Sequence, residues 1–218
     1  MVAILETKVP FSSMGFFFNQ FNLTESIKFD PTGRVGGIWM LWNPLTVNLK
    51  VFHASQQVIH AIITKNNFEE WLISAVYASP KHYLRDQLWT NLALVAKNCN
   101  YPWLVAGDFN DHANVSEKRS FRGDASNGRS YKFMENINNC NFVDLGCSGP
   151  RLTWSNGRHG LANTLVRLDR ALANPEWRIK FPDATVSNLP RSYSDHCPIL
   201  VNTEGNVTNP TPSNKKTF

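Results

Sequence analysis

Short apolar runs separated by polar and turn-forming residues recur along the chain, and this pattern predicts many short β-strands. One run carries Val58, Ile59, Ala61 and Ile63 and is apolar at nearly every position. Such a run is typical of a strand that is covered on both faces. We expect strands at residues 3–5, 37–42, 47–52, 58–63, 71–76, 103–106, 151–154, 166–172, 184–189 and 198–201.

Two segments carry apolar residues at helical spacing instead. Leu84, Leu88, Leu92 and Val95 stand four, four and three positions apart, which predicts an amphipathic helix. A shorter stripe of the same kind spans residues 133–140. We interpret both stripes as faces that pack on a core, not as cofactor sites. Many strands with few helices fit an α/β fold.

Turn-forming residues cluster at 146–150 and 155–160. From Thr203 onward, Asn, Pro, Thr, Ser and Lys dominate, and no apolar period survives. We therefore expect one domain over residues 1–202 and a disordered tail or truncated linker over residues 203–218.

The composition limits the class of protein. A chain of 218 residues with 42% hydrophobic residues can form one sizeable packed domain. Its net charge of +5 and pI of about 9.1 agree with a polyanionic partner without requiring one. The four cysteines lack CxxC or zinc spacing, so we expect reduced thiols and an intracellular protein, nuclear or cytoplasmic. The residues before Glu6 are too few for a signal peptide, and the apolar run 16–18 is too short for a membrane span. We expect a monomer that does not associate with membranes.

Candidate chemistry lies where polar residues meet the apolar runs. Asp108 and Asn110 follow the run 103–106, and side chains two positions apart point to the same side of an extended chain. Asp195 and His196 precede another apolar run, and both can reach one pocket if the backbone turns there. A metal-ligand carboxylate beside a catalytic imidazole is an arrangement that cleaves phosphoesters, although the Asp-His pair alone is weak evidence for it. The ordinary alternatives are an Asp/Asn turn and a solvated polar turn.

Two further acids stand in similar positions. Asp169 lies between Arg167 and Arg170 at the start of an apolar stretch, and Glu6 ends another near the N-terminus. A surface ion pair with either arginine is the ordinary alternative for Asp169. A solvent-facing charge is the alternative for Glu6. Four such segments in this order are much harder to explain by chance than any one alone.

Together these segments resemble the endonuclease/exonuclease/phosphatase superfamily, which includes DNase I and the apurinic/apyrimidinic endonucleases. Within it, the chain is most similar to the endonuclease domain of plant LINE-type non-LTR retrotransposons. The resemblance spans roughly residues 6–201 and rests on ILETK (4–8), GGIWMLW (36–42), VYASP (76–80), WLVAGDFND (103–111), SEKR (116–119), LTWSNG (152–157), RLDRALAN (167–174) and SDHCPIL (194–200). It implies a DNase I-like fold, an α/β sandwich of two packed sheets with helices outside.

The resemblance also implies an endonuclease that depends on Mg²⁺, with Mn²⁺ as an alternative ion, and hydrolyses phosphodiester bonds of DNA. That reaction needs charge neutralisation at the phosphoryl group, an aimed water and a stabilised leaving oxygen. Mg²⁺ prefers oxygen ligands and often takes one or two protein carboxylates. Glu6 and Asp195 match the metal positions of the family.

Five more residues match catalytic positions of the family. Asp108 matches the residue that activates water or handles the proton, and Asn110 matches a contact to the phosphate or to metal-bound water. His196 would donate hydrogen bonds to the phosphate as an imidazolium or act as a base, and Asp169 would orient its ring. Tyr77 would contact the phosphate through its hydroxyl, or else pack on the rim as a strand-end aromatic.

Basic residues near these motifs are candidates for nucleic-acid binding. Lys118, Arg119 and Arg122 follow the GDFN segment, and Arg158 lies in the loop after LTWSNG. They could bind flanking DNA phosphates. The alternative is that these loops are simply solvated.

The N-terminus departs from the family pattern. The family has another strand before the one that carries the glutamate, ending in an asparagine of the pocket, and no segment before Glu6 can replace it. We expect this first strand to be missing, which would leave an exposed sheet edge. One alternative to an active nuclease is therefore a catalytically decayed retrotransposon remnant with at most weak nucleic-acid binding. Another is a phosphatase of small phosphoesters, against which the basic charge and the retrotransposon-like motifs count.

Overall fold

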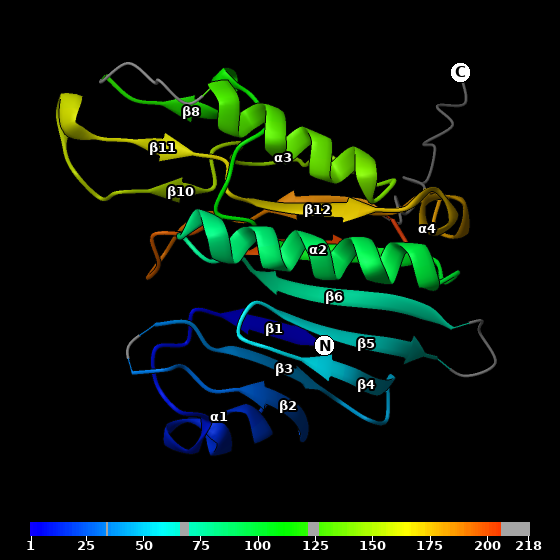
Figure 1. Ribbon diagram of the computed structural model, residues 1–218. Helices are drawn as coiled ribbons and strands as arrows, with labels where there is room; N and C mark the ends of the chain where they lie inside the picture. The colour runs from blue at the N-terminus through cyan, green and yellow to red at the C-terminus, as the bar shows by residue number, and fades with distance from the viewer. Residues whose placement is uncertain (34, 66–69, 122–126, 206–218) are drawn as a thin grey trace, which may run out of the picture.

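The computed structural model describes residues 1–33, 35–65, 70–121 and 127–205. Within these ranges the largest sheet has six strands in the order β4-β5-β6-β7-β12-β9 (Figure 1). The strands are β4 (Asn48–Ala54), β5 (Val58–Thr64), β6 (Trp71–Tyr77), β7 (Trp103–Asp108), β9 (Val143–Asp144) and β12 (Asp169–Ala173). The β6–β7 pair is parallel and the other neighbours are antiparallel.

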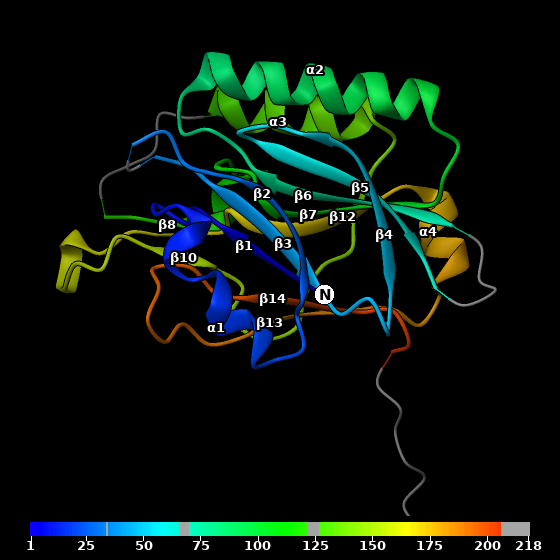
Figure 2. The ribbon, with the colours of Figure 1, turned by 90° about the horizontal axis from the view of Figure 1, so that it is seen from below.

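A second layer of strands packs on one face of this sheet (Figure 2). It contains a three-stranded sheet in the order β1-β3-β2 and a β13–β14 pair. The strands are β1 (Val2–Leu5), β2 (Glu25–Phe29), β3 (Ile38–Trp42), β13 (Thr185–Asn188) and β14 (Ile199–Asn202). Ile38 and Met40 of β3 share one core with Ile59 and Ala61 of β5 and with Val186 of β13. The predicted α/β sandwich is therefore confirmed.

Helices α2 (His82–Asn98) and α3 (Asn127–Asn139) cover the other face of the six-stranded sheet (Figure 2). Leu88 and Leu92 of α2 and Ile137 of α3 pack with Leu72 and Val105 of the sheet in a second core. Both apolar stripes in the sequence face this core, as predicted. Strand β5 lies between the two cores and is buried on both sides.

The face of β3 that points away from the main core is covered by a separate apolar cluster. Trp39 and Leu41 point away from the main core and pack with Phe18 of the short helix α1 (Gly15–Asn19). Every residue of β3 is consequently buried.

Short elements complete the described part of the chain. A small sheet in the order β10-β11-β8 extends past the end of the main sheet (Figure 1). These elements are β8 (Lys118–Arg119), β10 (Trp154–Ser155), β11 (Leu165–Val166), α4 (Pro175–Lys180) and the 3-10 turns η1 (Phe11–Ser13), η2 (Val115–Glu117) and η3 (Gly160–Ala162).

Several sequence-based boundaries were wrong. The strand expected at 166–172 is divided into β11 and β12, which belong to different sheets: Arg167 N still donates to Glu117 O at 2.8 Å, next to the β8 partner, whereas the chain pairs with β7 from Asp169 onward. The strand expected at 151–154 is reduced to β10. The pattern also missed β2, β8, β9, α1 and α4, which are short or have mixed polarity.

Strands β1 and β14 are edge strands of their sheets within the described ranges. Strand β1 is hydrogen-bonded to β3 on one side only, and β14 to β13 on one side only. After β14, residues 203–205 form a turn in which Asn202 Nδ2 donates to Gly205 O at 2.8 Å. The rest of the predicted tail, residues 206–218, lies outside the described residues. Among the described helices, none combines the length and the apolar character needed to cross a bilayer.

His60 is a fully buried polar residue in the middle of β5. Its Nδ1 lies 2.6 Å from Ser74 Oγ, its Nε2 lies 2.8 Å from Asn91 Oδ1, and its ring stacks on Phe52. Burial lowers the pKa of His60 to about 4, although the bond to Asn91 opposes this shift. The folded protein therefore holds His60 neutral at pH values where the unfolded chain protonates it.

His60 is expected to make the fold sensitive to acid. Because its folded pKa lies below the unfolded value, its contribution is present above about pH 6.5 and lost as the pH falls toward 4. That difference corresponds to about 3 kcal/mol of unfolding free energy. Urea unfolding of the parent and of His60→Gln at pH 7 and pH 4 measures it. If both proteins lose the same unfolding free energy between pH 7 and pH 4, groups other than His60 cause the acid sensitivity.

Candidate active site

Three neighbouring strands of the main sheet align Tyr77, Asp108 and Asp169. Tyr77 ends β6, Asp108 ends β7 and Asp169 begins β12. The strand register pairs Tyr77 with Asp108 and Asp108 with Asp169. Side chains directly opposite on adjacent strands lie on the same face of a sheet. The three residues therefore form a row at one end of the sheet.

His196 joins this row from the loop that precedes β14. Its Nδ1 lies 2.8 Å from Asp169 Oδ2. Burial alone would lower the pKa of His196, but the hydrogen bond to Asp169 and the charges of Asp169, Asp108 and Asp195 outweigh it and raise the pKa to about 9. The imidazole of His196 is consequently a cation at neutral pH.

Asp108 occupies the centre of the row and is buried. Burial and the charge of Asp169 raise the pKa of Asp108, against the opposing effects of His196 and the Asn110 N–H. Asn110 N donates to Asp108 Oδ1 at 2.8 Å, and Asn110 Nδ2 donates to Asp108 Oδ2 at 2.9 Å and Ala78 O at 2.7 Å. Both amide hydrogens of Asn110 are thus engaged by the protein, and its Oδ1 is the group that can meet a ligand.

Glu6 and Asp195, 189 positions apart in sequence, line the same cleft, which also contains Tyr77, Asp108, Asn110 and His196 and has a volume of about 520 Å³. Burial raises the pKa of Tyr77, and so do a hydrogen bond to Glu6 and the charges of Glu6, Asp108 and Asp195. Acidic groups from three separate segments therefore surround the Tyr77 hydroxyl, which stays protonated at neutral pH.

The donor set of the cleft fits a divalent cation. Glu6 and Asp195 offer carboxylate oxygens, the ligands that Mg²⁺ prefers, and solvent reaches both. In the described ranges, one trio of potential ligand atoms lies within 4.8 Å of one another, from Asp108, Asp169 and His196. Two of these atoms, His196 Nδ1 and Asp169 Oδ2, are already engaged with each other in a hydrogen bond of 2.8 Å. Glu6 and Asp195 are therefore the better candidates.

Of the basic residues predicted to bind nucleic acid, only some lie at the cleft. Lys118 lines the cleft. Arg119 and Arg158 are exposed and are not among the cleft-lining residues, and Arg158 lies in the connection between β10 and β11. Arg122 lies outside the described residues.

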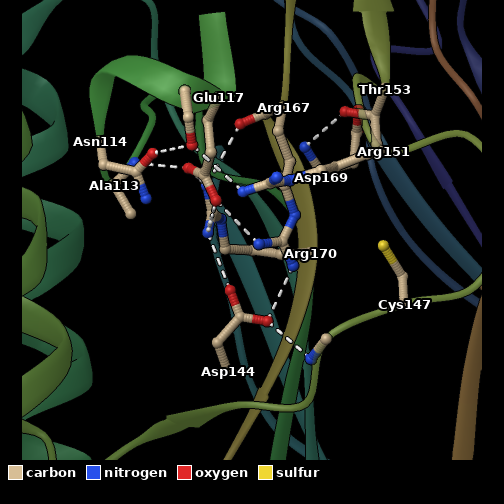
Figure 3. A network of polar contacts seen from close by, with 12 residues as sticks. Ala113, Asn114, Glu117, Asp144, Cys147, Arg151, Thr153, Arg167, Asp169 and Arg170 are labelled. Atoms are coloured by element: carbon tan, nitrogen blue, oxygen red, sulfur yellow. Dashed lines mark hydrogen bonds and ion pairs between the residues drawn. The ribbon is translucent and has the colours of Figure 1, made fainter.

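Two arginines beside Asp169 belong to a buried ion network (Figure 3). Arg167 Nη1 and Arg170 Nη2 lie 2.8 Å and 2.7 Å from the Glu117 carboxylate, and each arginine also meets Asp144 at 2.8 Å. The arginines lower the pKa of Glu117 and Asp144, overcoming burial in both cases. The ordinary alternative of an ion pair between Asp169 and these arginines is wrong, because they pair with Glu117 and Asp144 while Asp169 meets His196.

Sequence reasoning missed several residues that line or support the cleft, among them Arg85, Asp111, His112 and Trp154. Arg85 of α2 is buried, donates to Ser79 O and Pro80 O at 3.0 Å each, and lines the cleft. A charged residue inside a buried helical face was the available signal. Thr153 is not among the cleft-lining residues but accepts from Asp169 N, and Trp154 Nε1 donates to Asp195 Oδ2; only their place in the LTWSNG motif pointed to them.

A comparison with protein-family models matches residues 2–196 to the Endonuclease/Exonuclease/phosphatase family. The chain belongs to this family. The match covers nearly the whole chain and confirms the resemblance inferred from the motifs. A comparison with curated protein sequences found none that matches.

Solved structures share this family fold at low sequence identity. The endonuclease domain of TRAS1, a telomere-specific non-LTR retrotransposon, aligns with 93% of this chain and 98% of its own, with a TM-score of 0.62 and 14% identity. The APE2 catalytic domain of Xenopus laevis aligns over 90% and 81%, with a TM-score of 0.61 and 14% identity. D. rerio TDP2, complexed with single-strand DNA product, aligns over 91% and 83%, with a TM-score of 0.57 and 13% identity. At these identities the likeness establishes the fold.

Proposed function

We propose that this protein is a divalent-metal-dependent endonuclease that hydrolyses phosphodiester bonds of DNA. The observation that carries the proposal is the cationic His196, held by Asp169 beside Asp108, in a cleft that also contains Glu6 and Asp195. A phosphodiester carries negative charge, so a cationic donor and a metal-binding carboxylate pair suit its cleavage.

His196 and Asp169 act as one unit in this mechanism. Nδ1 is bonded to Asp169, which leaves Nε2 as the nitrogen that donates to a phosphate oxygen. Because Asp169 stabilises the imidazolium, the donor is charged before the substrate arrives. Its hydrogen bond strengthens as negative charge builds on the phosphoryl oxygens.

Asp108 and Asn110 handle the attacking water. The raised pKa of Asp108 brings its carboxylate closer to the range in which a side chain can take a proton from water at neutral pH. Asn110 Oδ1 is an acceptor and orients a water hydrogen, because its amide hydrogens are engaged by Asp108 and Ala78. The protonated Tyr77 hydroxyl donates to a phosphate oxygen or keeps Glu6 in place.

Glu6 and Asp195 would hold Mg²⁺, with Mn²⁺ as a substitute, because both present carboxylate oxygens to the cleft. A divalent cation there supplies charge neutralisation at the scissile phosphoryl group.

DNA is the favoured substrate for two reasons. Lys118 lies in the cleft and the chain carries a net charge of +5, which suits a polyanion. The structural relatives include a retrotransposon endonuclease and a protein bound to a DNA product.

Nicking of supercoiled plasmid tests the proposal. Purified protein is expected to produce open circles with Mg²⁺ and none with EDTA. Glu6→Gln should raise the Mg²⁺ concentration needed for half-maximal nicking, because it removes a metal-binding charge. Glu25→Gln, which changes an exposed carboxylate on β2, is the matched control and should nick like the parent.

The alternatives give different results in the same experiment. A folded parent that neither nicks nor binds Mg²⁺ would support a catalytically decayed remnant. A parent that hydrolyses p-nitrophenyl phosphate and leaves the plasmid intact would support a phosphatase.

A further inference from the structure

The LTWSNG segment connects the two segments that carry the proposed catalytic residues. On one side, Thr153 Oγ1 accepts hydrogen bonds from the backbone N–H groups of Leu168 and Asp169, both at 3.0 Å (Figure 3). On the other side, Ser155 N donates to Asp195 O at 3.0 Å, and Cys197 N donates to Thr153 O at 2.8 Å. Residues 153–155 therefore hold Asp169 and residues 195–197 in register.

Trp154 adds a side-chain contact to this backbone frame. Its indole Nε1 donates to Asp195 Oδ2 at 2.9 Å. Trp154 is half-buried and lines the cleft, whereas Asp195 is exposed. An exposed carboxylate has a broad distribution about its last torsion. A donor on a bulky, partly buried ring restricts that rotation.

We propose that Trp154 is a positioning residue for Asp195. The indole N–H holds Oδ2, so that Oδ1 is presented to a divalent cation in the cleft. This role rests on the proposed function, because it requires Asp195 to be a metal ligand. This role would explain why the LTWSNG segment carries a residue with an indole N–H at position 154.

The size of the expected effect is based on hydrogen bonds that orient metal ligands in other proteins. Hydrogen-bond partners that orient metal ligands commonly account for about 10- to 100-fold in metal affinity or activity. Loss of the indole N–H should leave Asp195 present and charged but free to rotate. Cation affinity should therefore fall without being abolished.

The experiment compares Trp154→Phe with the parent in direct Mn²⁺ binding, measured by calorimetry without nucleic acid. Phenylalanine keeps an aromatic ring and removes the N–H donor. The Kd for Mn²⁺ is expected to rise about 10-fold or more. The Mn²⁺ concentration for half-maximal nicking should rise by a similar factor. In an Asp195→Asn background, Trp154→Phe should change the Kd no further, because Trp154 acts through that carboxylate.

Trp39→Phe is the matched control. Trp39 Nε1 also donates to a carboxylate, Asp30 Oδ1, at 3.3 Å, but Trp39 does not line the cleft. Its replacement should leave the Kd for Mn²⁺ unchanged. Urea unfolding of all variants separates loss of cation affinity from loss of folded protein.

Each other outcome overturns the inference in a recognisable way. An unchanged Kd in Trp154→Phe, with a parent that binds Mn²⁺, refutes the role of Trp154 alone. If that variant instead shows only a higher KM for DNA, Trp154 is a substrate contact. A parent that binds no Mn²⁺ refutes the metal role of Asp195, and with it both the proposed function and this inference.

Discussion

Replacing His196 with alanine is expected to slow DNA nicking about 100- to 1,000-fold, roughly 3–4 kcal/mol of transition-state stabilisation. In the proposed mechanism the imidazolium is held by Asp169 and charged before substrate binds, so its contribution would grow as the phosphoryl oxygens gain charge. Single-turnover nicking at saturating Mg²⁺ measures the effect. Urea unfolding of the same variant should also show some loss of stability, because the buried Asp169 carboxylate loses its partner, so rates are compared at equal concentrations of folded protein. Equal rates for His196→Ala and the parent would remove His196 from the mechanism.

Asp169→Asn tests whether the two residues work as one unit. This variant should lose less than His196→Ala, because the ring remains while its orientation and charge lose support. The double variant should be no slower than His196→Ala alone, since residues that act as a unit are not additive. If the losses in nicking rate are independent and additive, Asp169 does not act through His196.

The positions of these catalytic candidates could be predicted because they follow from local pattern. Asp108 stands where an apolar run ends, and this places it at the end of a buried strand. Strand pairing then aligned it with Tyr77 and Asp169. The order of the motifs along the chain added Glu6 and His196 to the predicted site. The pattern could not predict which side chains come within hydrogen-bonding distance, such as His196 Nδ1 and Asp169 Oδ2.

The elements that the pattern missed depend on contacts between distant residues. Arg167 and Arg170 look like surface charges in sequence, yet both are buried because Glu117 and Asp144 neutralise them. No periodicity reveals a partner 50 positions away. Arg85 was missed although two of its partners, Ser79 O and Pro80 O, are close in sequence, because nothing in the helical pattern shows that its ion pair with Asp111 is buried.

Helix α4 was missed for a different reason. With six residues it is too short to show a helical apolar period. Its start is nevertheless marked by Asn174, whose side chain accepts from Trp177 N, and by Pro175 in the first turn. Capping residues were the usable signal, whereas hydrophobic spacing was not.

The ion network of Arg167, Arg170, Glu117 and Asp144 is centred on a buried carboxylate. Glu117 is 2% exposed, accepts from Arg167 and Arg170, and also accepts from Ala113 N at 2.7 Å. It therefore joins the segment that leads to Lys118 with the strand that begins at Asp169. Removing it would leave two arginines with one acidic partner, Asp144, whose side chain is 28% exposed.

Glu117→Ala is accordingly expected to reduce the free energy of unfolding by about 3–5 kcal/mol, because it leaves a buried charge uncompensated. Asp86→Ala is the matched control: Asp86 pairs with Lys132 at 2.7 Å, but both side chains are about half exposed, so the loss should stay below about 1 kcal/mol. Urea unfolding at pH 7 measures both. If Glu117→Ala loses no more than Asp86→Ala, the two arginines find water or other partners, and the network does not hold β12 in place. If it loses several times more, the strand that begins at Asp169 is stabilised by a carboxylate that is not among the cleft-lining residues.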